Sequence, residues 1–405
     1  MILDLFERFI REGELTLIEA NGASHRFGSG TPRVTWVMRK RNTLARILRN
    51  PALQLGETYM NEGWDVTHGS LADLLTILRH NVSMRFRMHT PWGRVASLLQ
   101  SWNDVAHSIA NVHAHYDLDE ALFRAFLDRN MHYSCAYFRE PDMSLESAQI
   151  AKCNHVANKL LLDSGQRVLD IGSGWGSLAM HLAETSNVSV TGLTLSPEQL
   201  RVAAAESARR GFSDRVEFLL QDYRSHRGQY DRVVSVGMFE HVGRRNFLRY
   251  FHQLSRQLRP GGVALIHTIG SARPPSPTNP WIRRHIFPGG YIPSLSELAG
   301  SIERAGLVLG DVEVLRPHYA LTLKEWNRRF QTQRAQFVAS KGERFCRMWE
   351  FYLVASQTAF ECGDLVVFQM QLGQDDAQIP ATRDYLYNQT TEALGNVESG
   401  ALSER

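Results

Sequence analysis

"VLDIGSGWGS", residues 168 to 177, is the stretch that decides the fold of this chain. An apolar run leads into Asp170, and Gly172, Gly174 and Gly176 follow at alternate positions before a helical pattern begins. Glycine accepts left-handed backbone and lets the main chain approach a ligand closely. An apolar strand that enters such a turn and then a helix indicates a ligand site at the edge of a sheet.

The chain after residue 165 alternates strand and helix patterns, which predicts a mostly parallel sheet covered on both faces. Predicted strands are 167–172, 188–194, 216–222, 231–238 and 262–269, and "DVEVLR" and "LVVFQMQL" complete a seven-stranded sheet. One intervening helix carries a full set of signals, with Ser196 as N-cap, Pro197 in the first turn and Gly211 as the stop. The predicted fold class is α/β.

Three regions are predicted along the 405 residues, because one hydrophobic core seldom spans this length. Residues 1–118 form a smaller mixed, mainly helical N-terminal domain that includes strands around an Asn21-Gly22 turn. Residues 119–374 form the main domain, with insertions at 271–300 and 317–360 placed as lids over the mouth of the sheet. Residues 375–405 are polar and are expected to form a flexible tail.

Composition excludes several classes of function. The net charge of +3 is small for this length, so nucleic acid is not expected as a partner. The four cysteines lack CxxC spacing, which argues against a metal site and a disulfide framework and fits a cytoplasmic protein. No secretory signal is visible, and no stretch approaches the ~20 apolar residues that span a bilayer.

The glycine spacing points to one type of cofactor. A dinucleotide site has G-x-G-x-x-G, whereas the G-x-G-x-G found here resembles the first motif of class I methyltransferases, in which the turn faces the amino-acid part of S-adenosylmethionine. The expected ribose-binding acid is missing after the second strand, where Thr194 and Gln199 stand. After the third strand, Asp222 can accept a hydrogen bond from the adenine amino group and Tyr223 can stack on the base. A turn that merely ends a strand is the disfavoured alternative.

Several segments together resemble one family. They are "NPALQLGETYMNEGWDV", "HYDLDEALFRAFLD", "MHYSCAYF", "VLDIGSGWG", "GLTLSPEQ", "LQDYR", "VGMFEHVG", "LIHTIG", "IFPGGYIPSL" and "HYALTLKEWNRRF". They resemble the cyclopropane-fatty-acyl-phospholipid synthase family, which includes the mycolic acid cyclopropane synthases and shares the missing ribose acid. The resemblance implies transfer of a methylene group from S-adenosylmethionine to the cis double bond of a phospholipid acyl chain, forming a cyclopropane ring.

The resemblance also implies site residues. The cofactor would be lined by Tyr133, Ser134, Gly172, Gly174, Thr194, Gln199, Asp222 and Tyr223. A bound bicarbonate ion would act as the base and would be held by Glu240, His267, Tyr319 and the backbone at Cys135 and Ile269. The alternative for Glu240 is an acid at a helix start, and for His267 it is a core histidine.

This chemistry needs a dry pocket, because water would quench the carbocation that forms when an alkene attacks a methyl group on sulfur. Aromatic rings can wall such a pocket, and the candidates are Tyr133, Tyr137, Phe138, Phe239 and Tyr291. Cys135 has only His132 nearby as a base, so we interpret it as a wall residue rather than a thiolate nucleophile. Ser356 stands where some family members carry a cysteine, which argues against an essential thiolate there.

Phospholipid substrates require contact with a membrane. The basic stretches "RKRNTLARILR" (39–49) and "RHNVSMRFRMH" (79–89) can bind anionic headgroups, and "PPSPTNPWIRRHIFPGG" (274–290) is a candidate lid or lipid entry. A solvated basic face is the alternative. The prediction is a cytoplasmic protein at the inner face of the membrane, with an unsaturated phospholipid acyl chain and the membrane surface as partners and a homodimer left open.

Three other functions stay open. The same site could methylate the alkene without closing the ring and leave a methyl or methylene branch. An amine N-methyltransferase is more distant, because the N-terminal domain looks like that of the lipid enzymes. A catalytically inactive lipid- or cofactor-binding protein is disfavoured by the presence of Glu240, His267 and Tyr319.

Overall fold

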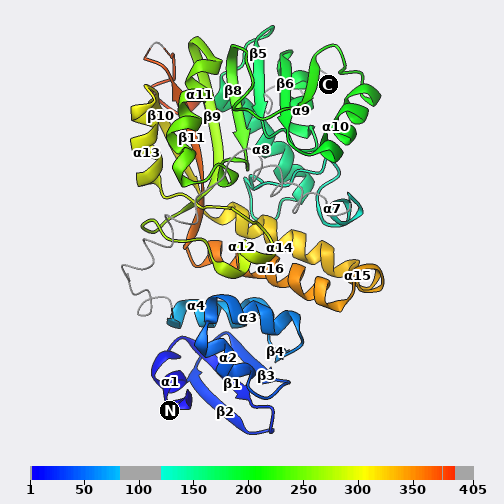
Figure 1. Ribbon diagram of the computed structural model, residues 1–405, viewed down its shortest axis with the longest axis vertical. Helices are drawn as coiled ribbons and strands as arrows, with labels where there is room; N and C mark the ends of the chain where they lie inside the picture. Colours follow the sequence, from blue (N-terminus) through cyan, green and yellow to red (C-terminus); the bar gives the residue numbers. More distant parts are fainter. Residues whose placement is uncertain (1, 83–119, 376, 388–405) are drawn as a thin grey trace, which may run out of the picture.

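The computed structural model describes residues 2–82, 120–375 and 377–387. They form two sheets, a four-stranded one near the N-terminus and a seven-stranded one in the rest of the chain. Figure 1 shows the small sheet at the lower end and the large sheet at the upper end, with a layer of long helices between them. The boundary predicted near residue 118 lies outside the described residues.

The N-terminal unit is a mixed sheet in the order β2-β1-β3-β4 with helices on it. Its elements are α1 Ile2–Phe9, β1 Gly13–Ile18, β2 Ser24–Ser29, β3 Arg33–Met38, α2 Thr43–Arg49, α3 Pro51–Met60, β4 Trp64–His68 and α4 Leu71–Val82. β1 and β2 pair antiparallel across a turn in which Gly22 has φ +89°, so the predicted hairpin is confirmed. The short strand β4 was not predicted.

The large sheet has the order β10-β11-β9-β8-β5-β6-β7. Its strands are β5 Arg167–Ile171, β6 Ser189–Thr194, β7 Val216–Leu220, β8 Tyr230–Val236, β9 Leu258–Ser271, β10 Val308–Leu315 and β11 Leu365–Gly373. β5 to β9 are parallel where they pair, and β11 runs antiparallel to β9 and β10. The predicted seven-stranded, mostly parallel α/β sheet is confirmed. β9 extends beyond its predicted end at 269 because β11 pairs with it as far as Ser271.

Helices cover both faces of this sheet. The helices on its faces include α8 Leu145–Leu160, α9 Ser177–Ser186, α10 Pro197–Arg209, α11 Phe247–Gln257 and α13 Leu295–Arg304. The other helices of this part of the chain are α7 Glu120–Phe126, α12 Pro280–His285, α14 Pro317–Thr332, α15 Arg334–Lys341 and α16 Glu343–Glu361. Leu169 and Ile171 of β5 pack with α11 and α13, while Val168 packs with α8 and α9. Because strand side chains alternate, Asp170 also lies on the α8 side. The Ser196 cap and the Gly211 stop of α10 are as predicted.

The helices α14 and α16 lie between the large sheet and the N-terminal unit (Figure 1). Arg347 of α16 donates to the carbonyl oxygens of Tyr59 and Trp64 and to Asp65 Oδ1, at 2.6, 2.9 and 2.6 Å. Its guanidinium carbon also lies 4.0 Å from the centre of the Tyr59 ring. A buried cation held at four points anchors the N-terminal unit to these helices.

A second link changes the interpretation of one basic stretch. Arg79 of α4 donates to Asp364 Oδ2 at 3.2 Å and to the Ala355 carbonyl at 3.0 Å, so it serves an internal contact rather than a lipid headgroup. His80 of the same stretch lies 3.2 Å from Glu12 Oε2 through its Nδ1, and Arg85, Arg87 and His89 lie outside the described residues. In the parts of the chain that the structure does describe, no helix is both long and apolar enough to cross a bilayer.

Part of the C-terminal segment departs from the predicted flexible tail. Arg383 pairs with Asp311 of β10 at 2.5 Å, and Tyr385 donates to Gln371 of β11 at 2.9 Å. Leu386 is buried. The polar composition of the tail does not reveal these anchors, because Arg383 and Tyr385 act through contacts with distant strands.

Gly56 of α3 lies against the buried indole of Trp281 in α12, and this contact yields a stability prediction. A Cβ atom added at Gly56 would lie 2.5 Å from Trp281 Nε1. Replacing glycine by alanine inside a helix gains about 1 kcal/mol, whereas overpacking a core costs roughly 1–3 kcal/mol. We therefore expect Gly56→Ala to lower the free energy of unfolding, measured with urea.

Gly300 in α13 is the matched control. An added Cβ meets nothing within 4 Å there, so Gly300→Ala is expected to raise the free energy of unfolding. A Gly56→Ala protein that gains as much stability as Gly300→Ala would contradict the packing of α12 on α3.

Candidate active site

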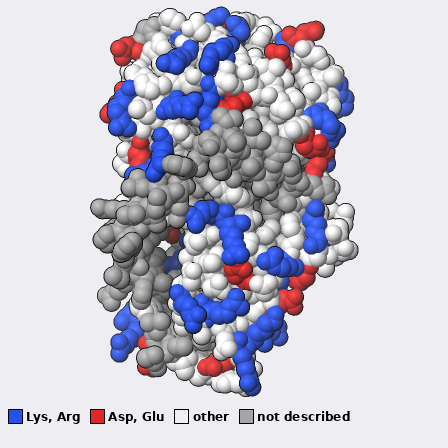
Figure 2. Space-filling view, in the orientation of Figure 1, with Lys and Arg blue, Asp and Glu red and all other residues white. Residues whose placement is uncertain are grey.

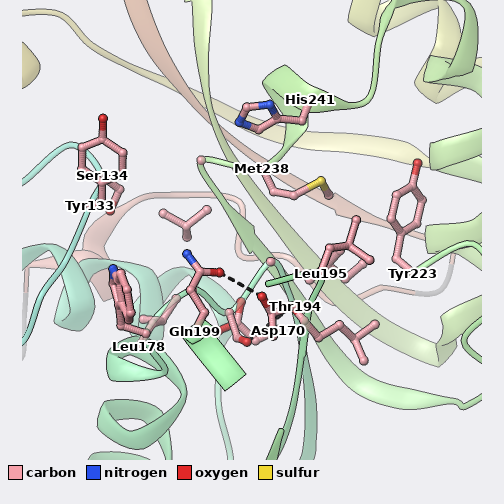
Figure 3. A pocket seen from close by; sticks show the side chains of 18 of the residues that line it. Tyr133, Ser134, Asp170, Leu178, Thr194, Leu195, Gln199, Tyr223, Met238 and His241 are labelled. Carbon is pink, nitrogen blue, oxygen red and sulfur yellow. Dashed lines mark hydrogen bonds between the residues drawn. The ribbon is translucent and has the colours of Figure 1, made fainter. Parts of the chain in front are cut away.

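One pocket lies at the carboxyl ends of β5, β6, β7 and β8. All eight predicted cofactor residues line it: Tyr133, Ser134, Gly172, Gly174, Thr194, Gln199, Asp222 and Tyr223. Figure 3 shows Ser134 at one end, Tyr223 at the other and Gln199 between them. Parallel strands bring these residues together because their carboxyl ends share one edge of the sheet.

The glycine turn forms the floor of the pocket. Gly172 has φ +87°, and a Cβ added there would lie 2.8 Å from Met238 Cβ, so both backbone and packing require glycine. Gly174 has φ +54°, and a Cβ there would meet nothing within 4 Å. Gly174 therefore faces open space in which a ligand can approach the backbone closely.

Gln199 presents an amide donor where other methyltransferases are expected to place an acid. Ser196 N donates to Thr194 Oγ1 at 3.1 Å, and Thr194 Oγ1 donates to Gln199 Oε1 at 2.9 Å. These hydrogen bonds occupy the amide oxygen of Gln199, so its NH2 group is the part that faces the pocket (Figure 3). An NH2 group in this position can donate to a hydroxyl oxygen of a ribose.

Asp222 has a partner that the sequence analysis missed. Arg224 Nε and Nη2 donate to Asp222 Oδ1 and Oδ2 at 2.8 and 2.6 Å, and both side chains are nearly buried. A carboxylate has about four acceptor positions, so Asp222 can still accept from an amino group of a base. The adjacent ring of Tyr223 packs edge-on against Tyr250 at 5.2 Å.

Several pocket residues were not predicted. They are His132, Lys152, Asp170, Trp175, Arg224 and His241. Lys152 carried a usable signal, because it lies in "AQIAKCNHVANKL" at helical spacing among apolar positions and so on the buried face of α8. Burial raises the pKa of Asp170 to about 7 and lowers the pKa of His241 to about 4.

His132 interacts with Cys153 rather than with Cys135. His132 Nε2 lies 3.2 Å from Cys153 Sγ, and its Nδ1 lies 2.9 Å from Asp128 Oδ2. Cys135 Sγ donates to the Ala136 carbonyl at 3.3 Å, and burial raises the pKa of the Cys135 thiol. Cys135 is therefore a neutral thiol in a packed wall.

Glu240 lies just past β8, in the short 3₁₀ helix Phe239–His241. Its Oε1 accepts from Ile269 N at 2.6 Å, so this amide, which was expected to hold bicarbonate, already has an acceptor. Its Oε2 is buried and has no hydrogen-bond partner among the described residues. Burial raises the pKa of Glu240 to about 7. A buried carboxylate oxygen without a donor indicates a missing ligand or solvent molecule.

His267 lies two residues before Ile269 in β9, opposite the end of β8. Gln369 Nε2 of β11 lies 3.0 Å from His267 Nδ1 and donates to it. Burial lowers the pKa of His267 to about 3, so the ring is neutral and carries its proton on Nε2. Nε2 is thereby a hydrogen-bond donor.

Tyr319 and Cys135 lie in a large apolar cluster and, like Glu240 and His267, are not among the described residues that line the pocket. Both belong, with Ile269, to one apolar cluster, and Thr322, one turn after Tyr319 on α14, accepts from Ala136 N at 3.1 Å. The Tyr319 ring packs on Phe360 at 4.8 Å and on Trp326 at 5.9 Å. The four predicted catalytic residues thus come from β8, β9, α14 and the segment before α8.

The aromatic wall is largely different from the predicted one. Tyr133 is part of it, stacked on Trp326 at 5.2 Å and bonded through its hydroxyl to Tyr352 at 2.8 Å. Phe123 and Phe126 also contact Tyr133, and they pack in turn on Trp175 and Trp349. Phe239 and Tyr291 pack instead with α11, and Tyr137 lies between His155 and His318. Most of the wall comes from α7, α14 and α16, which are remote in sequence.

Comparison with known proteins gives the family. The sequence profile of mycolic acid cyclopropane synthetase matches residues 103–370, and that of a domain of unknown function matches residues 10–89. Cyclopropane-fatty-acyl-phospholipid synthase of Escherichia coli K12 is 39% identical over 327 residues, 80% of this chain and 84% of that protein. Tuberculostearic acid methyltransferase of Mycobacterium tuberculosis is 37% identical over 380 residues, 88% of this chain and 87% of that protein.

Solved structures agree. The cyclopropane synthase MmaA2 from Mycobacterium tuberculosis has a TM-score of 0.63 at 34% identity and covers 67% of this chain and 99% of its own. Mycolic acid cyclopropane synthase CmaA1, solved with S-adenosylhomocysteine and CTAB, has a TM-score of 0.62 at 35% identity, with 65% and 97% covered. Coclaurine N-methyltransferase, at 20% identity, shares the fold alone. These matches confirm the predicted class I methyltransferase fold, and the chain belongs to the mycolic acid cyclopropane synthetase family of S-adenosylmethionine-dependent enzymes.

Proposed function

We propose that this enzyme transfers a methylene group from S-adenosylmethionine to the cis double bond of an unsaturated phospholipid acyl chain and closes a cyclopropane ring. The observation that carries the proposal is the buried Oε2 of Glu240, which has no hydrogen-bond partner among the described residues, in a carboxylate held to β9 through Ile269 in a chain of this family. The bound cofactor supplies an electrophilic methyl group on a positively charged sulfur.

The residues of the pocket fit this cofactor. Gly174 leaves room at the turn, the Gln199 amide faces the position of a ribose, and Asp222 and Tyr223 lie at the far end for the base. The rings of Tyr133 and Trp326 exclude water, and their faces attract positive charge. A cation that forms on the acyl chain is thereby protected from hydration.

A small oxyanion fits the second group of residues. Glu240 Oε2 needs a donor, and a bicarbonate hydroxyl can supply it, while His267 Nε2 and the Tyr319 hydroxyl are suited to donate to the other oxygens. Bicarbonate bound here would accept the proton that leaves the new methyl group. Glu240 has to be ionised to accept this hydrogen bond, and Gln369 keeps the His267 proton on the nitrogen that donates.

Methylation without ring closure is the second candidate. It is favoured by a relative that is named as a methyltransferase, the tuberculostearic acid methyltransferase, which matches 88% of this chain. Ring closure and branching diverge only after the methyl group has been attached, so both use the same cofactor pocket. The identity of the product separates them.

The product is best read by proton NMR. We expect that a bacterium without cyclopropane lipids, once it expresses this chain, contains phospholipid acyl chains with high-field cyclopropyl signals. Glu240→Ala should abolish them, and Glu303→Ala, an exposed acid on α13, should not. Methyl-branch or vinylidene signals would establish the second candidate, and unchanged lipids would refute both.

Glu240 also yields a pH prediction for the protein without ligands. Burial raises its pKa from 4.5 to about 7, so the folded protein binds the extra proton and loses this stabilisation as pH rises through about 7. We expect the free energy of unfolding of the wild type to fall relative to Glu240→Gln between about pH 5 and about pH 8. The fall should approach about 3 kcal/mol, at ~1.4 kcal/mol per pKa unit.

Glu240→Gln is the reference for the wild type, because the two proteins share all other titrating groups. A stability difference that stays constant over this range would show that Glu240 is solvated in the folded protein.

We further propose that the N-terminal unit contacts the membrane from one side. Arg41 and Arg49, near and at the ends of α2, are exposed, and Arg284 of α12, which packs on α3, is 65% exposed. In the view of Figure 2, Lys and Arg side chains gather at the level of the N-terminal unit. Anionic headgroups attract such side chains by about 1 kcal/mol each.

Vesicle sedimentation tests this surface. Arg41→Glu with Arg49→Glu should weaken binding to phosphatidylglycerol vesicles by about tenfold or more, and added salt should weaken binding of the wild type. The control is Arg256→Glu with Arg304→Glu, two exposed arginines on α11 and α13 that give the same change of charge. Equal losses in both pairs would mean that net charge, and not this surface, governs binding.

A further inference from the structure

Lys152 is a buried lysine that forms no ion pair with the described residues. It lies in the middle of α8, is 1% exposed and lines the cofactor pocket. Among the described residues its Nζ makes one hydrogen bond, a long one of 3.4 Å to Ser134 Oγ, and no ion pair. A buried charge is costly unless it is paired, so an ammonium in this position calls for an anionic partner.

The nearby acids do not fill this role. Asp128 accepts from the backbone N and the ring Nδ1 of His132, at 2.8 and 2.9 Å. Asp170 faces α8 from β5 but forms no ion pair with Lys152, and its Oδ2 has no hydrogen-bond partner among the described residues. The charge of Lys152 therefore stays available to a ligand in the pocket.

Lys159 on the same helix shows what a satisfied buried lysine looks like. It is fully buried, and its Nζ donates to Glu313 Oε2 at 2.5 Å. Glu313 is held in turn by His155 Nε2 at 2.6 Å. Lys159 and Lys152 are two turns apart on α8, and only Lys152 faces the cofactor pocket.

The position of Lys152 in the pocket indicates which part of the cofactor lies next to it. Ser134, which accepts from Lys152, lies at the end of the pocket opposite Tyr223, with Gln199 between them (Figure 3). With the base at Tyr223 and the ribose at Gln199, the end at Ser134 receives the amino acid. Gln149 on α8 fixes this end by donating to the Ser134 carbonyl at 3.0 Å.

We infer that Lys152 binds the α-carboxylate of the amino-acid part of S-adenosylmethionine and so completes the buried charge pair that the free protein lacks. The inference rests on the cofactor in the proposed function and is independent of the lipid substrate. Lys152 is then an affinity-determining residue for the cofactor, remote from the transferred carbon.

Calorimetric titration of the full chain with two ligands tests this. The ligands are S-adenosylhomocysteine and its decarboxylated analogue, which lacks only the carboxylate. Lys152→Met should weaken S-adenosylhomocysteine binding by about 30-fold or more, the usual loss when one partner of a buried charge pair is removed. The same variant should bind the decarboxylated analogue as tightly as the wild type does, or more tightly.

Lys159→Met is the matched control and should leave the ratio of the two affinities unchanged. If Lys152→Met does not fold, Lys152→Gln gives the same comparison. Equal losses for both ligands would overturn the inference, because they would show that Lys152 only shapes the pocket, and so would no loss for either. Since no lipid is present, the result stands even if the lipid product proves different.

Discussion

The parallel pairing of β5, β6, β7 and β8 is the constraint on which the site depends. It brings four strand ends to one edge, where Thr194 ends β6 and Gly172, Asp222 and Glu240 follow their strands within four residues. Residues far apart in the chain thereby line one pocket. The same register sets Asp170 and His267 on the face covered by α8, so buried charges gather on that side of the sheet.

Burial is the second theme of the site. Glu240, His267, Asp170 and Lys152 are each at most 8% exposed, and their protonation or pairing is governed by the absence of water. Glu240 Oε2 and Asp170 Oδ2 have no hydrogen-bond partner within the described part of the chain, and such atoms cost stability until a ligand satisfies them. Under the proposed function, this cost in folding stability accompanies a site that is ready to bind a small anion and the zwitterionic end of the cofactor.

Much of this could be predicted from sequence, because it is encoded locally. The strands, the glycine turn and the Ser196 cap all follow from short patterns, and the cofactor residues follow from motifs at strand ends. The aromatic wall could not be predicted, since Trp326 and Trp349 reach Tyr133 and Phe126 only through packing of α14 and α16. The strand β4 and the anchors of the C-terminal segment depend likewise on tertiary contacts. The clamp of Arg224 on Asp222 is local, between residues two apart, and was missed all the same.

The central claim is that a dry pocket holds an oxyanion between Glu240 and His267 beside the transferred carbon. A crystal structure of the protein with S-adenosylhomocysteine and bicarbonate tests it most directly. The account predicts an anion within hydrogen-bond distance of Glu240 Oε2, His267 Nε2 and the Tyr319 hydroxyl, adjacent to the cofactor sulfur. It is contradicted if these side chains point away from the sulfur or open onto bulk solvent.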